Sequence, residues 1–472
     1  MFKRILVANR GECAIRIMRS CTELGIETVA IYTEADRYSL HVRKANHAVM
    51  IGPDPVKNYL NIHRIIDVAL EMGCDAIHPG YGFLSENADF AKCVVEAGIT
   101  YIGPDPDAID NMGNKTKART AMLAANVPVT PGSEGCLIDI DDALTQARAM
   151  GYPIMLKAAA GGGGRGIRRC DDDHELRENF PITQSEAMGA FGSDDLFMEK
   201  CIIEPHHIEF QILADQQGNV VHLFERDCSI QRRNQKLIEI APSNFLTPEV
   251  REAMGTVAVN AAKAVNYVNA GTVEFLVDKD HNFYFMEMNT RLQVEHTITE
   301  AITGIDIVSE QIHIAAGKTL SFKQEDVSIQ GFAIEYRINA EDPLNNFFPT
   351  PGLITRYHSP GGPGVRVDGG VYPGYEIPPY FDSMCAKLTV WASTWENAVK
   401  RSQRALEEYD IRGVRTTLPF YRHIAASSVF LEGEFHTGFL SLHPELLEYK
   451  PYHSREDIAA AVAAAIAAHA GL

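Results

Sequence analysis

Residues 157–170 read KAAAGGGGRGIRRC, a lysine and three alanines followed by a glycine-rich run. Gly161, Gly163 and Gly166 match the GxGxxG spacing of dinucleotide-binding loops, but in that fold the third glycine opens a helix. Here the strand-like IRRC follows, and the helical DDDHELRE comes after it. A P-loop is excluded because isoleucine and arginine follow Gly166 where lysine and serine or threonine are required. The segment therefore predicts two strands joined by a glycine-rich hairpin tip.

This tip has two interpretations. Backbone N–H groups of Gly161, Gly162, Gly163 and Gly164 can close over nucleotide phosphates, while Lys157 at the end of the preceding strand supplies a positive charge. A solvent-exposed turn without a ligand is the alternative, because glycine turns are common.

The composition is that of a globular protein. The chain has 472 residues, 46% of them hydrophobic, which is enough for roughly two to four domains. A formal net charge of −19 argues against nucleic-acid binding, so local cations must hold any anionic substrate. Nine cysteines without a CxxC pair favour reduced thiols and a cytoplasmic location. The N-terminal MFKRILVANRGE lacks the apolar length of a signal peptide or membrane span, so no membrane partner is expected.

The order of apolar patterns predicts a chain that combines α/β and α+β domains. Strands and helices alternate over 1–112, which indicates a doubly wound parallel sheet. Residues 113–329 mix both element types in a nucleotide-binding domain with an inserted lobe at about 130–201. Short strands between Pro/Gly loops predict a small β-rich, barrel-like domain over 330–446, and 447–472 form an alanine-rich helical tail.

A second hairpin is predicted in GTVEFLVDKDHNFYFMEMNTRLQVEH, residues 271–296. A turn centred between Asp280 and His281 would pair Glu274 with Glu287, and the period of two places Asn289 on the face of Glu287. Two carboxylates and an amide oxygen suit a hard cation such as Mg²⁺, which also bridges nucleotide phosphates. A solvated acidic face is the alternative, but apolar residues interrupt these carboxylates.

Cations gather in RDCSIQRRNQKLIEIAP, residues 226–242. Arg226, Arg232, Arg233 and Lys236 form a dense group in an acidic protein, which favours binding of anions such as phosphate or bicarbonate. A solvated basic loop is the alternative.

A ligand-binding position is also predicted in HPGYGFLSENADFA, residues 78–91. A strand end there leads into a glycine-rich loop and then into a helix that we expect to be capped near Ser85. On chemistry alone the segment indicates no particular ligand.

Together these segments resemble the biotin carboxylases, which belong to the ATP-grasp superfamily. The matching segments follow the family order from residue 2 to about 440, more than nine-tenths of the chain: ILVANRGECA, HPGYGFLSEN, MGNKTKAR, KAAAGGGGRGIR, FMEK, HHIEFQ, ERDCSIQRR, FMEMNTRLQVEH, RINAED and PPYFDSM. The resemblance implies a doubly wound N-terminal domain, a central ATP-grasp domain with a mobile glycine-rich lid, and a C-terminal biotin carboxylase domain.

The resemblance also implies an ATP site with a divalent metal. Lys115 and Lys157 would bind the phosphates, and His207 would lie near the ribose. The remaining ATP-binding residues would be Gly161, Gly162, Gly163, Gly164, Glu199, Lys200, Ile202 and Gln231, of which Glu199, Lys200 and Ile202 line the adenine pocket. Glu274 and Glu287 would hold Mg²⁺ or Mn²⁺, with Asn289 beside them.

Bicarbonate and biotin would bind next to this nucleotide. The bicarbonate residues implied by the resemblance are Lys236, Arg291, Gln293, Val294 and Glu295. Glu295 would act as the general base while ATP converts bicarbonate to carboxyphosphate, with Lys236 and Arg291 also catalytic. Arg337 would face the ureido oxygen of biotin, with Tyr81 nearby, and stabilise the negative charge that develops there.

Four positions depart from the family pattern, of which Ala160, where some members carry another glycine, should matter little. Asn234 stands where histidine is usual in QRRHQK and carries no charge, and Ile240 replaces a usual glutamate. Pro363 occupies a position that is often aromatic at the family's dimer interface, while the resemblance as a whole implies a homodimer.

The expected partners follow from what the sequence lacks. No AMKM-like biotinylation sequence occurs in the chain, so we expect the biotin carboxyl carrier protein and the carboxyltransferase to be separate subunits. The final acceptor could be acetyl-CoA, pyruvate, or another acyl-CoA or 2-oxo acid. Two other functions stay open: another ATP-grasp carboxylate or carbamoyl ligase, and a noncatalytic nucleotide-binding regulator.

Overall fold

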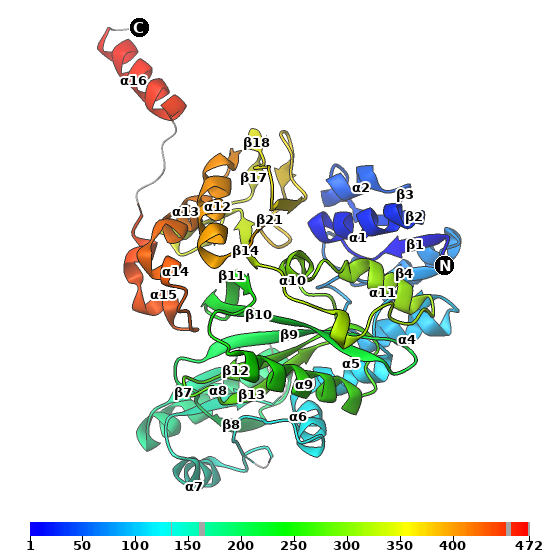
Figure 1. Ribbon diagram of the computed structural model, residues 1–472, viewed down its shortest axis with the longest axis vertical. Coiled ribbons are helices and arrows are strands. Elements are labelled where there is room, and N and C mark those ends of the chain that lie inside the picture. Colours follow the sequence, from blue (N-terminus) through cyan, green and yellow to red (C-terminus); the bar gives the residue numbers. More distant parts are fainter. Residues whose placement is uncertain (134, 160–165, 450–454, 471–472) are drawn as a thin grey trace.

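The computed structural model describes residues 1–133, 135–159, 166–449 and 455–470. Figure 1 shows an N-terminal unit in blue, a broad sheet in green, a C-terminal unit in yellow and orange, and a red helix that stands apart from the rest. This arrangement confirms the predicted combination of α/β and α+β elements.

The N-terminal unit is a five-stranded parallel sheet in the order β3-β2-β1-β4-β5. Its strands are β1 (Arg4–Val7), β2 (Glu27–Thr33), β3 (His47–Gly52), β4 (Ala76–His78) and β5 (Thr100–Tyr101). Its helices are α1 (Gly11–Glu23), α2 (Leu40–Lys44), α3 (Ile62–Glu71), α4 (Ala88–Glu96) and α5 (Pro106–Gly113).

Both faces of this sheet are covered, which explains the uninterrupted apolar run ILVA. Alternate side chains of β1 point to opposite faces. Ile5 and Val7 lie in the core that contains α1, whereas Leu6 and Ala8 lie in the core that contains α3 and α4. The predicted doubly wound sheet is therefore confirmed.

One local prediction in this unit is wrong. Helix α4 is capped by Asn87, whose side chain accepts a hydrogen bond from the backbone N–H of Phe90 at 2.7 Å, and not near Ser85. Ser85 is buried in the preceding turn, where its carbonyl accepts a hydrogen bond from the Tyr101 hydroxyl. Asparagine is as good an N-cap as serine, so the residue directly before the helix takes that role.

The central sheet has eight antiparallel strands in the order β13-β12-β9-β10-β11-β14-β21-β19. Its strands are β9 (His206–Ala214), β10 (Val220–Arg232), β11 (Gln235–Ala241), β12 (Asn269–Val277), β13 (Phe283–Asn289), β14 (Phe332–Asn339), β19 (Val365–Gly369) and β21 (Met384–Ala392). The associated helices are α6 (Lys115–Ala124), α9 (Pro248–Ala264), α10 (His296–Thr303) and α11 (Ile307–Ala315). Strands β14, β21 and β19 come from the β-rich C-terminal region, so that region continues the central sheet.

A smaller lobe carries the glycine-rich segment. Its three antiparallel strands, in the order β7-β6-β8, are β6 (Ile154–Ala158), β7 (Ile167–Cys170) and β8 (Leu196–Lys200), with α7 (Ile140–Met150) and α8 (Asp173–Phe191) beside them. Lys157 pairs with Ile167, and helix α8 begins after β7, so the predicted order of strand, glycines, strand and helix is confirmed. Gly161, Gly162, Gly163 and Gly164 lie outside the described residues.

The remaining elements belong to the C-terminal part. They are the short strands β15 (Glu341–Asp342), β16 (Phe348–Pro349), β17 (Gly352–Leu353), β18 (Arg356–His358), β20 (Glu376–Ile377) and β22 (Asp410–Arg412), and the helices α12 (Trp395–Glu408), α13 (Leu418–Ala426), α14 (Ser428–Glu432), α15 (Phe439–Leu442) and α16 (Arg455–His469). Helix α16 is the predicted alanine-rich helix (Figure 1). Within the described ranges, no helix has the length and apolar character needed to cross a membrane.

Helix α4 offers a matched pair of stability tests. Phe90 is fully buried with its ring 6.0 Å from that of Tyr101, whereas Val95 on the same helix is 56% exposed. Phe90→Ala should destabilise the N-terminal unit by about 3–5 kcal/mol through lost burial and a residual cavity. Val95→Ala should have almost no effect, since alanine favours a helix. Chemical denaturation followed by circular dichroism tests both, and equal effects would contradict this packing.

Candidate active site

A cavity of about 980 Å³ opens where the N-terminal unit, the small lobe and the central sheet meet. The predicted site residues that line it are Tyr81, Lys115, Lys157, Glu199, Lys200, Ile202, His207, Gln231, Lys236, Glu274, Glu287, Asn289, Arg291, Gln293, Val294, Glu295 and Arg337. Residues as far apart in the chain as Tyr81 and Arg337 thus line one cavity. Their individual roles stay predictions.

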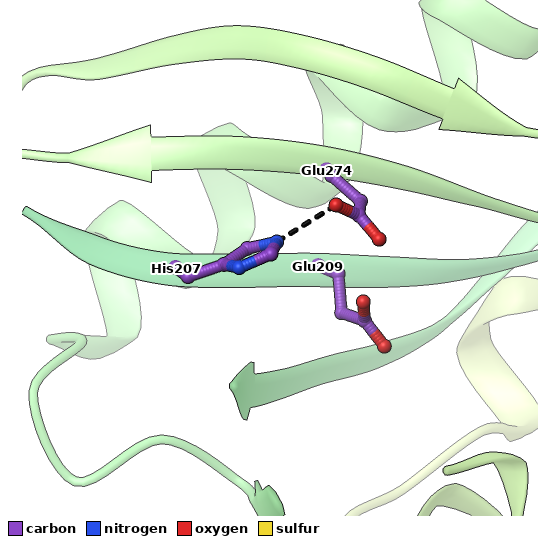
Figure 2. Close-up of side chains that lie close together, drawn as sticks. All are labelled: His207, Glu209 and Glu274. Carbon is purple, nitrogen blue, oxygen red and sulfur yellow. Dashed lines mark hydrogen bonds and ion pairs between the residues drawn. The ribbon is translucent and has the colours of Figure 1, made fainter. Parts of the chain in front are cut away.

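The floor of the cavity is acidic. His207 and Glu209 lie on β9, and Glu209 pairs across the sheet with Glu274 on β12. Figure 2 shows the His207 ring directed at Glu274, where Nε2 lies 2.7 Å from Oε2. All three side chains are buried, so their charges require partners close by.

Lys236 on β11 supplies the central positive charge. Its Nζ donates to Glu209, to Glu274 Oε1 at 2.9 Å and to Glu295 Oε1 at 2.8 Å. Burial opposes the charged form, but Cys228 and the three carboxylates hold the pKa of Lys236 well above its usual range. One ammonium group therefore joins carboxylates from three separate segments.

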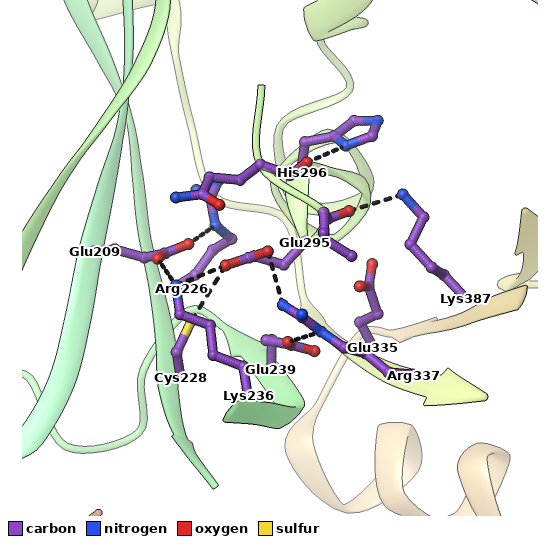
Figure 3. A network of polar contacts seen from close by, with 12 residues as sticks. Glu209, Arg226, Cys228, Lys236, Glu239, Glu295, His296, Glu335, Arg337 and Lys387 are labelled. Carbon is purple, nitrogen blue, oxygen red and sulfur yellow. Dashed lines mark hydrogen bonds and ion pairs between the residues drawn. The ribbon is translucent and has the colours of Figure 1, made fainter. Parts of the chain in front are cut away.

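Glu295 is held between two cations (Figure 3). Its other oxygen accepts a hydrogen bond from Arg337 at 3.0 Å, and Arg337 Nε also donates to Glu239 at 2.6 Å. Burial would raise the pKa of Glu295, but Lys236 and Arg337 hold it well below its usual range. Glu295 is therefore an ionised carboxylate at neutral pH, the form that accepts a proton.

The predicted pairing of Glu274 with Glu287 is confirmed by the register of β12 and β13. Burial and the charge of Glu274 raise the pKa of Glu287, which accepts no hydrogen bond from any described residue. Burial would also raise the pKa of Glu274, but Lys236 and His207 hold it below its usual range. A divalent cation between these hard oxygen ligands would relieve their repulsion, so the residues present fit Mg²⁺.

Asn289 forms hydrogen bonds with Glu274 and Arg291 in this structure. Its amide Nδ2 donates to Glu274 at 2.8 Å, and its Oδ1 accepts from Arg291 at 3.1 Å. The amide group therefore links the carboxylate to a neighbouring cation. A metal ligand would have to be its oxygen, which here faces the guanidinium group.

Lys115 and Lys157 both line the cavity. Lys115 opens helix α6, and burial lowers its pKa while Glu287 opposes that shift. Lys157 on β6 forms an ion pair with Glu199 on β8. Lys200 donates to the backbone carbonyls of Gly151 and Tyr152, at 2.7 and 3.0 Å. Glu199 and Lys200 thus also make contacts within the small lobe.

Arg291 connects the central sheet to the N-terminal unit. Its Nε donates to Glu86 at 2.9 Å, and its NH1 donates to Gln293 Oε1 at 2.8 Å. Gln293 in turn donates to Glu274 at 3.3 Å. Together with Tyr81, whose loop also contains Glu86, these residues place the N-terminal unit beside the bicarbonate residues predicted above.

The predicted group of four cations does not form one patch. Arg226 is fully buried and hydrogen-bonds to Glu209 and to Gln211, the latter at 2.7 Å. Arg232 lies over the Phe347 ring at 4.6 Å. Arg232 lies six positions along β10 from Arg226, and the strand register shifts on either side of Ile230, so the two guanidinium groups do not share one site. Of the four, Lys236 contacts Glu274 and Glu295, and Arg226 contacts Glu209 beside them.

The structure accounts for two departures from the family pattern. Arg233 and Asn234, with φ of 49° and 64°, form the turn between β10 and β11. Asparagine adopts such left-handed angles more readily than most residues, which explains its presence there. Ile240 is buried against its cross-strand neighbour Ile334, while the adjacent Glu239 reaches Arg337.

Three residues of the site, Glu209, Glu239 and Cys228, are not among the predicted ones. With Arg226 they surround Lys236 and Glu295 (Figure 3). A signal for Glu209 is present in HHIEFQ, where polar residues alternate with apolar ones along a fully buried strand. Polar side chains repeated on one face of a buried strand indicate a site.

Known proteins share this architecture along the whole chain. Family models described as the biotin carboxylase N-terminal domain, the ATP-binding domain of the carbamoyl-phosphate synthase L chain, and the biotin carboxylase C-terminal domain match residues 1–109, 114–323 and 335–442. The 2-oxoglutarate carboxylase small subunit of Hydrogenobacter thermophilus is 54% identical over 472 residues, all of both chains. This chain belongs to the biotin carboxylase family.

Further relatives agree with this assignment. Biotin carboxylase 1 of Bacillus subtilis is 54% identical over 94% of this chain and 99% of its own. Among solved structures, the biotin carboxylase domain dimer of the Hydrogenobacter thermophilus 2-oxoglutarate carboxylase, in complex with MgADP, ADP and bicarbonate, has a TM-score of 0.92 at 55% identity, covering 96% of this chain and 100% of that one. The biotin carboxylase subunit of a pyruvate carboxylase has a TM-score of 0.85 at 56% identity, with the same coverage. This biotin carboxylase is an ATP-dependent ligase that carboxylates biotin.

The two paired carboxylates should respond differently to neutralisation. Glu287→Gln should raise the Mg²⁺ concentration for half-maximal ATP hydrolysis by roughly tenfold or more. It should leave the melting temperature nearly unchanged, because Glu287 accepts no hydrogen bond from a described residue. Glu274→Gln should impair both properties, since it weakens the contacts to Lys236 and His207. Magnesium titrations and thermal melts test this, and an unchanged Mg²⁺ requirement for Glu287→Gln would contradict it.

Proposed function

We propose that this biotin carboxylase activates bicarbonate with ATP as carboxyphosphate, and transfers CO₂ to biotin on a separate carrier protein, with ADP and phosphate as the other products. The observation that carries the proposal is the ionised carboxylate of Glu295, held between Lys236 and Arg337 on the cavity wall. The Glu274 and Glu287 pair lies in the same cavity.

Bicarbonate would bind between Lys236, Arg291, Gln293 and Val294. Glu295 takes the bicarbonate proton as the resulting oxyanion attacks the γ-phosphorus of ATP, and the bond to ADP breaks. Lys115 and Lys157 neutralise the negative charge that gathers on the phosphates. Mg²⁺ held by Glu274 and Glu287 would supply further neutralisation of the phosphate oxygens.

Biotin would then receive CO₂ from carboxyphosphate. Cleavage of carboxyphosphate yields CO₂ and phosphate, and the phosphate takes the ureido N–H proton. The ureido nitrogen attacks CO₂ while Arg337 stabilises the negative charge on the ureido oxygen. Tyr81 lies on the N-terminal side of the same cavity, where it would contact the biotin ring.

The nucleotide assignments form part of the same proposal. The relative solved with MgADP and bicarbonate supports an ATP and Mg²⁺ site in this cavity. Glu199, Lys200 and Ile202 would line the adenine pocket, His207 would lie near the ribose, and Gln231 would complete the site. Among the described residues, each of these reaches the cavity.

The main alternative is a different ATP-grasp ligase. The central family model is described by the carbamoyl-phosphate synthase L chain, but biotin carboxylase models match the segments on both sides of it. A noncatalytic regulator would not need the ionised Glu295 and the Arg337 beside it. Both observations favour biotin carboxylation.

We propose a 2-oxo acid as the final acceptor, carboxylated by a separate carboxyltransferase subunit. One relative that matches this chain over its full length, including the alanine-rich tail, is the small subunit of a 2-oxoglutarate carboxylase. Biotin carboxylase 1 of Bacillus subtilis aligns over 445 residues. A homodimer and a cytoplasmic location complete the proposal, supported by the dimer of the solved relative and by nine free cysteines. Addition of the partner subunit should yield carboxylated 2-oxo acid, and a product from acetyl-CoA alone would contradict the acceptor.

Glu295 and Arg337 provide the central test. Glu295→Gln preserves size but removes the proton acceptor, and should lower bicarbonate-dependent biotin carboxylation by about 100-fold or more. Arg337→Met should cause a loss of similar size by removing the group that stabilises the ureido oxygen. The measurement is incorporation of labelled bicarbonate into free biotin. Slow bicarbonate-independent ATP hydrolysis is the control for an intact nucleotide site, and near wild-type carboxylation by either variant would refute the mechanism.

A further inference from the structure

Two consecutive carbonyl groups before helix α10 are each held by a buried basic side chain. Nδ1 of His296 lies 2.7 Å from the Gln293 carbonyl oxygen, and Nζ of Lys387 donates to the Val294 carbonyl oxygen at 2.8 Å. A carbonyl oxygen can only accept, so His296 carries its proton on Nδ1. Figure 3 shows His296 and Lys387 beside the segment that leads to Glu295.

Neither basic side chain reaches the cavity. His296 and Lys387 are fully buried, and both are absent from the cavity lining, whereas Gln293, Val294 and Glu295 all belong to it. Lys387 lies on β21 opposite Arg337 of β14, so it comes from the C-terminal part of the chain. Their influence on the reaction must therefore pass through the backbone of residues 293–295.

The geometry of the peptide bond determines what these contacts do. In a trans peptide the C=O and N–H groups point in opposite directions. The Gln293 carbonyl is fixed toward His296, so the N–H of Val294 in the same peptide points away from His296. The Val294 carbonyl is fixed toward Lys387, so the N–H of Glu295 points away from Lys387. Neither N–H donates to any residue in the described part of the chain. Two adjacent unpaired N–H groups beside the cavity form a cradle for an anion.

We infer that Lys387 and His296 are positioning residues, which direct the backbone N–H groups of Val294 and Glu295 at bicarbonate. The inference rests on the proposed function, in which residues 291–295 bind bicarbonate. It adds two residues that touch no substrate: His296, which ends the segment FMEMNTRLQVEH but was given no role there, and Lys387, which lies outside every quoted segment.

Contacts on the far side of Lys387 support this role. Nζ lies 3.4 Å from Glu12 Oε2 at the start of α1, and 5.7 Å from the centre of the Tyr81 ring. Burial raises the pKa of Glu12 to about 7, with Lys387 opposing that shift. Lys387 therefore connects the bicarbonate segment to the unit that supplies Tyr81, the proposed biotin contact.

The test compares the Michaelis constants for bicarbonate and for ATP. Lys387→Met and His296→Phe each remove one donor while keeping much of the buried volume. Each should raise KM for bicarbonate about tenfold or more, because the N–H cradle is no longer fixed, and leave KM for ATP within about twofold. His296→Asn places an amide N–H near the position of Nδ1–H and should keep KM for bicarbonate close to that of the wild type.

Three outcomes would overturn the inference. One is a folded Lys387→Met variant with unchanged KM for bicarbonate, and another is an equal rise of both constants, which indicates general distortion. If Lys387→Met does not fold, the comparison of His296→Phe with His296→Asn decides. Equal KM values for bicarbonate in these two variants overturn the inference. The wild type in the same assay distinguishes failure of the proposed function from failure of the positioning role. If the wild type lacks bicarbonate-dependent turnover, the proposed function fails. If the wild type turns over normally and the variants have unchanged KM for bicarbonate, only the positioning role is refuted.

Discussion

The rest of the site depends on the ion pairs that the ammonium group of Lys236 makes with three buried carboxylates. Glu209, Glu274 and Glu295 approach each other in a buried space, where their mutual repulsion would be costly without a cation. Arg226 contributes a second positive charge through its ion pair with Glu209. The acidic floor can therefore form before any metal or substrate binds, and the ligands join an already balanced set of charges.

The continuous sheet brings the two halves of the reaction together. Strand β11 pairs with β14, so Glu239 of the central region and Arg337 of the C-terminal region lie close enough to form an ion pair. Had the β-rich region been a separate body, Arg337 would have reached Glu295 only through a domain interface. Backbone hydrogen bonds of a shared sheet fix this distance more firmly than side-chain contacts across an interface would.

Local patterns in the sequence were enough for part of this site. The pairing of Glu274 with Glu287 was predicted from the midpoint of one hairpin, and in the structure it also needs the register shift between Glu274 and Phe275, since Phe275 pairs with Phe285. The antiparallel pair of β6 and β7 was predicted from the strand-like residues after Gly166. Both depend on contacts between residues near in sequence. The burial of Arg226 beside Glu209 depends on which face of a central strand each side chain occupies. The contact of Lys387 with Val294 joins residues 93 positions apart, which no local pattern specifies.

The two cations on Glu295 also bear on the timing of proton transfer. A carboxylate whose pKa is held so far below the usual range is a weak base. Bicarbonate is itself an anion, and in the proposed complex it takes hydrogen bonds from Lys236 and lies beside Arg337. Each contact that moves from Glu295 to the substrate raises the pKa of Glu295, as does the added negative charge nearby. Binding of the substrate that carries the proton therefore strengthens the base that removes it, and without bicarbonate Glu295 remains ion-paired.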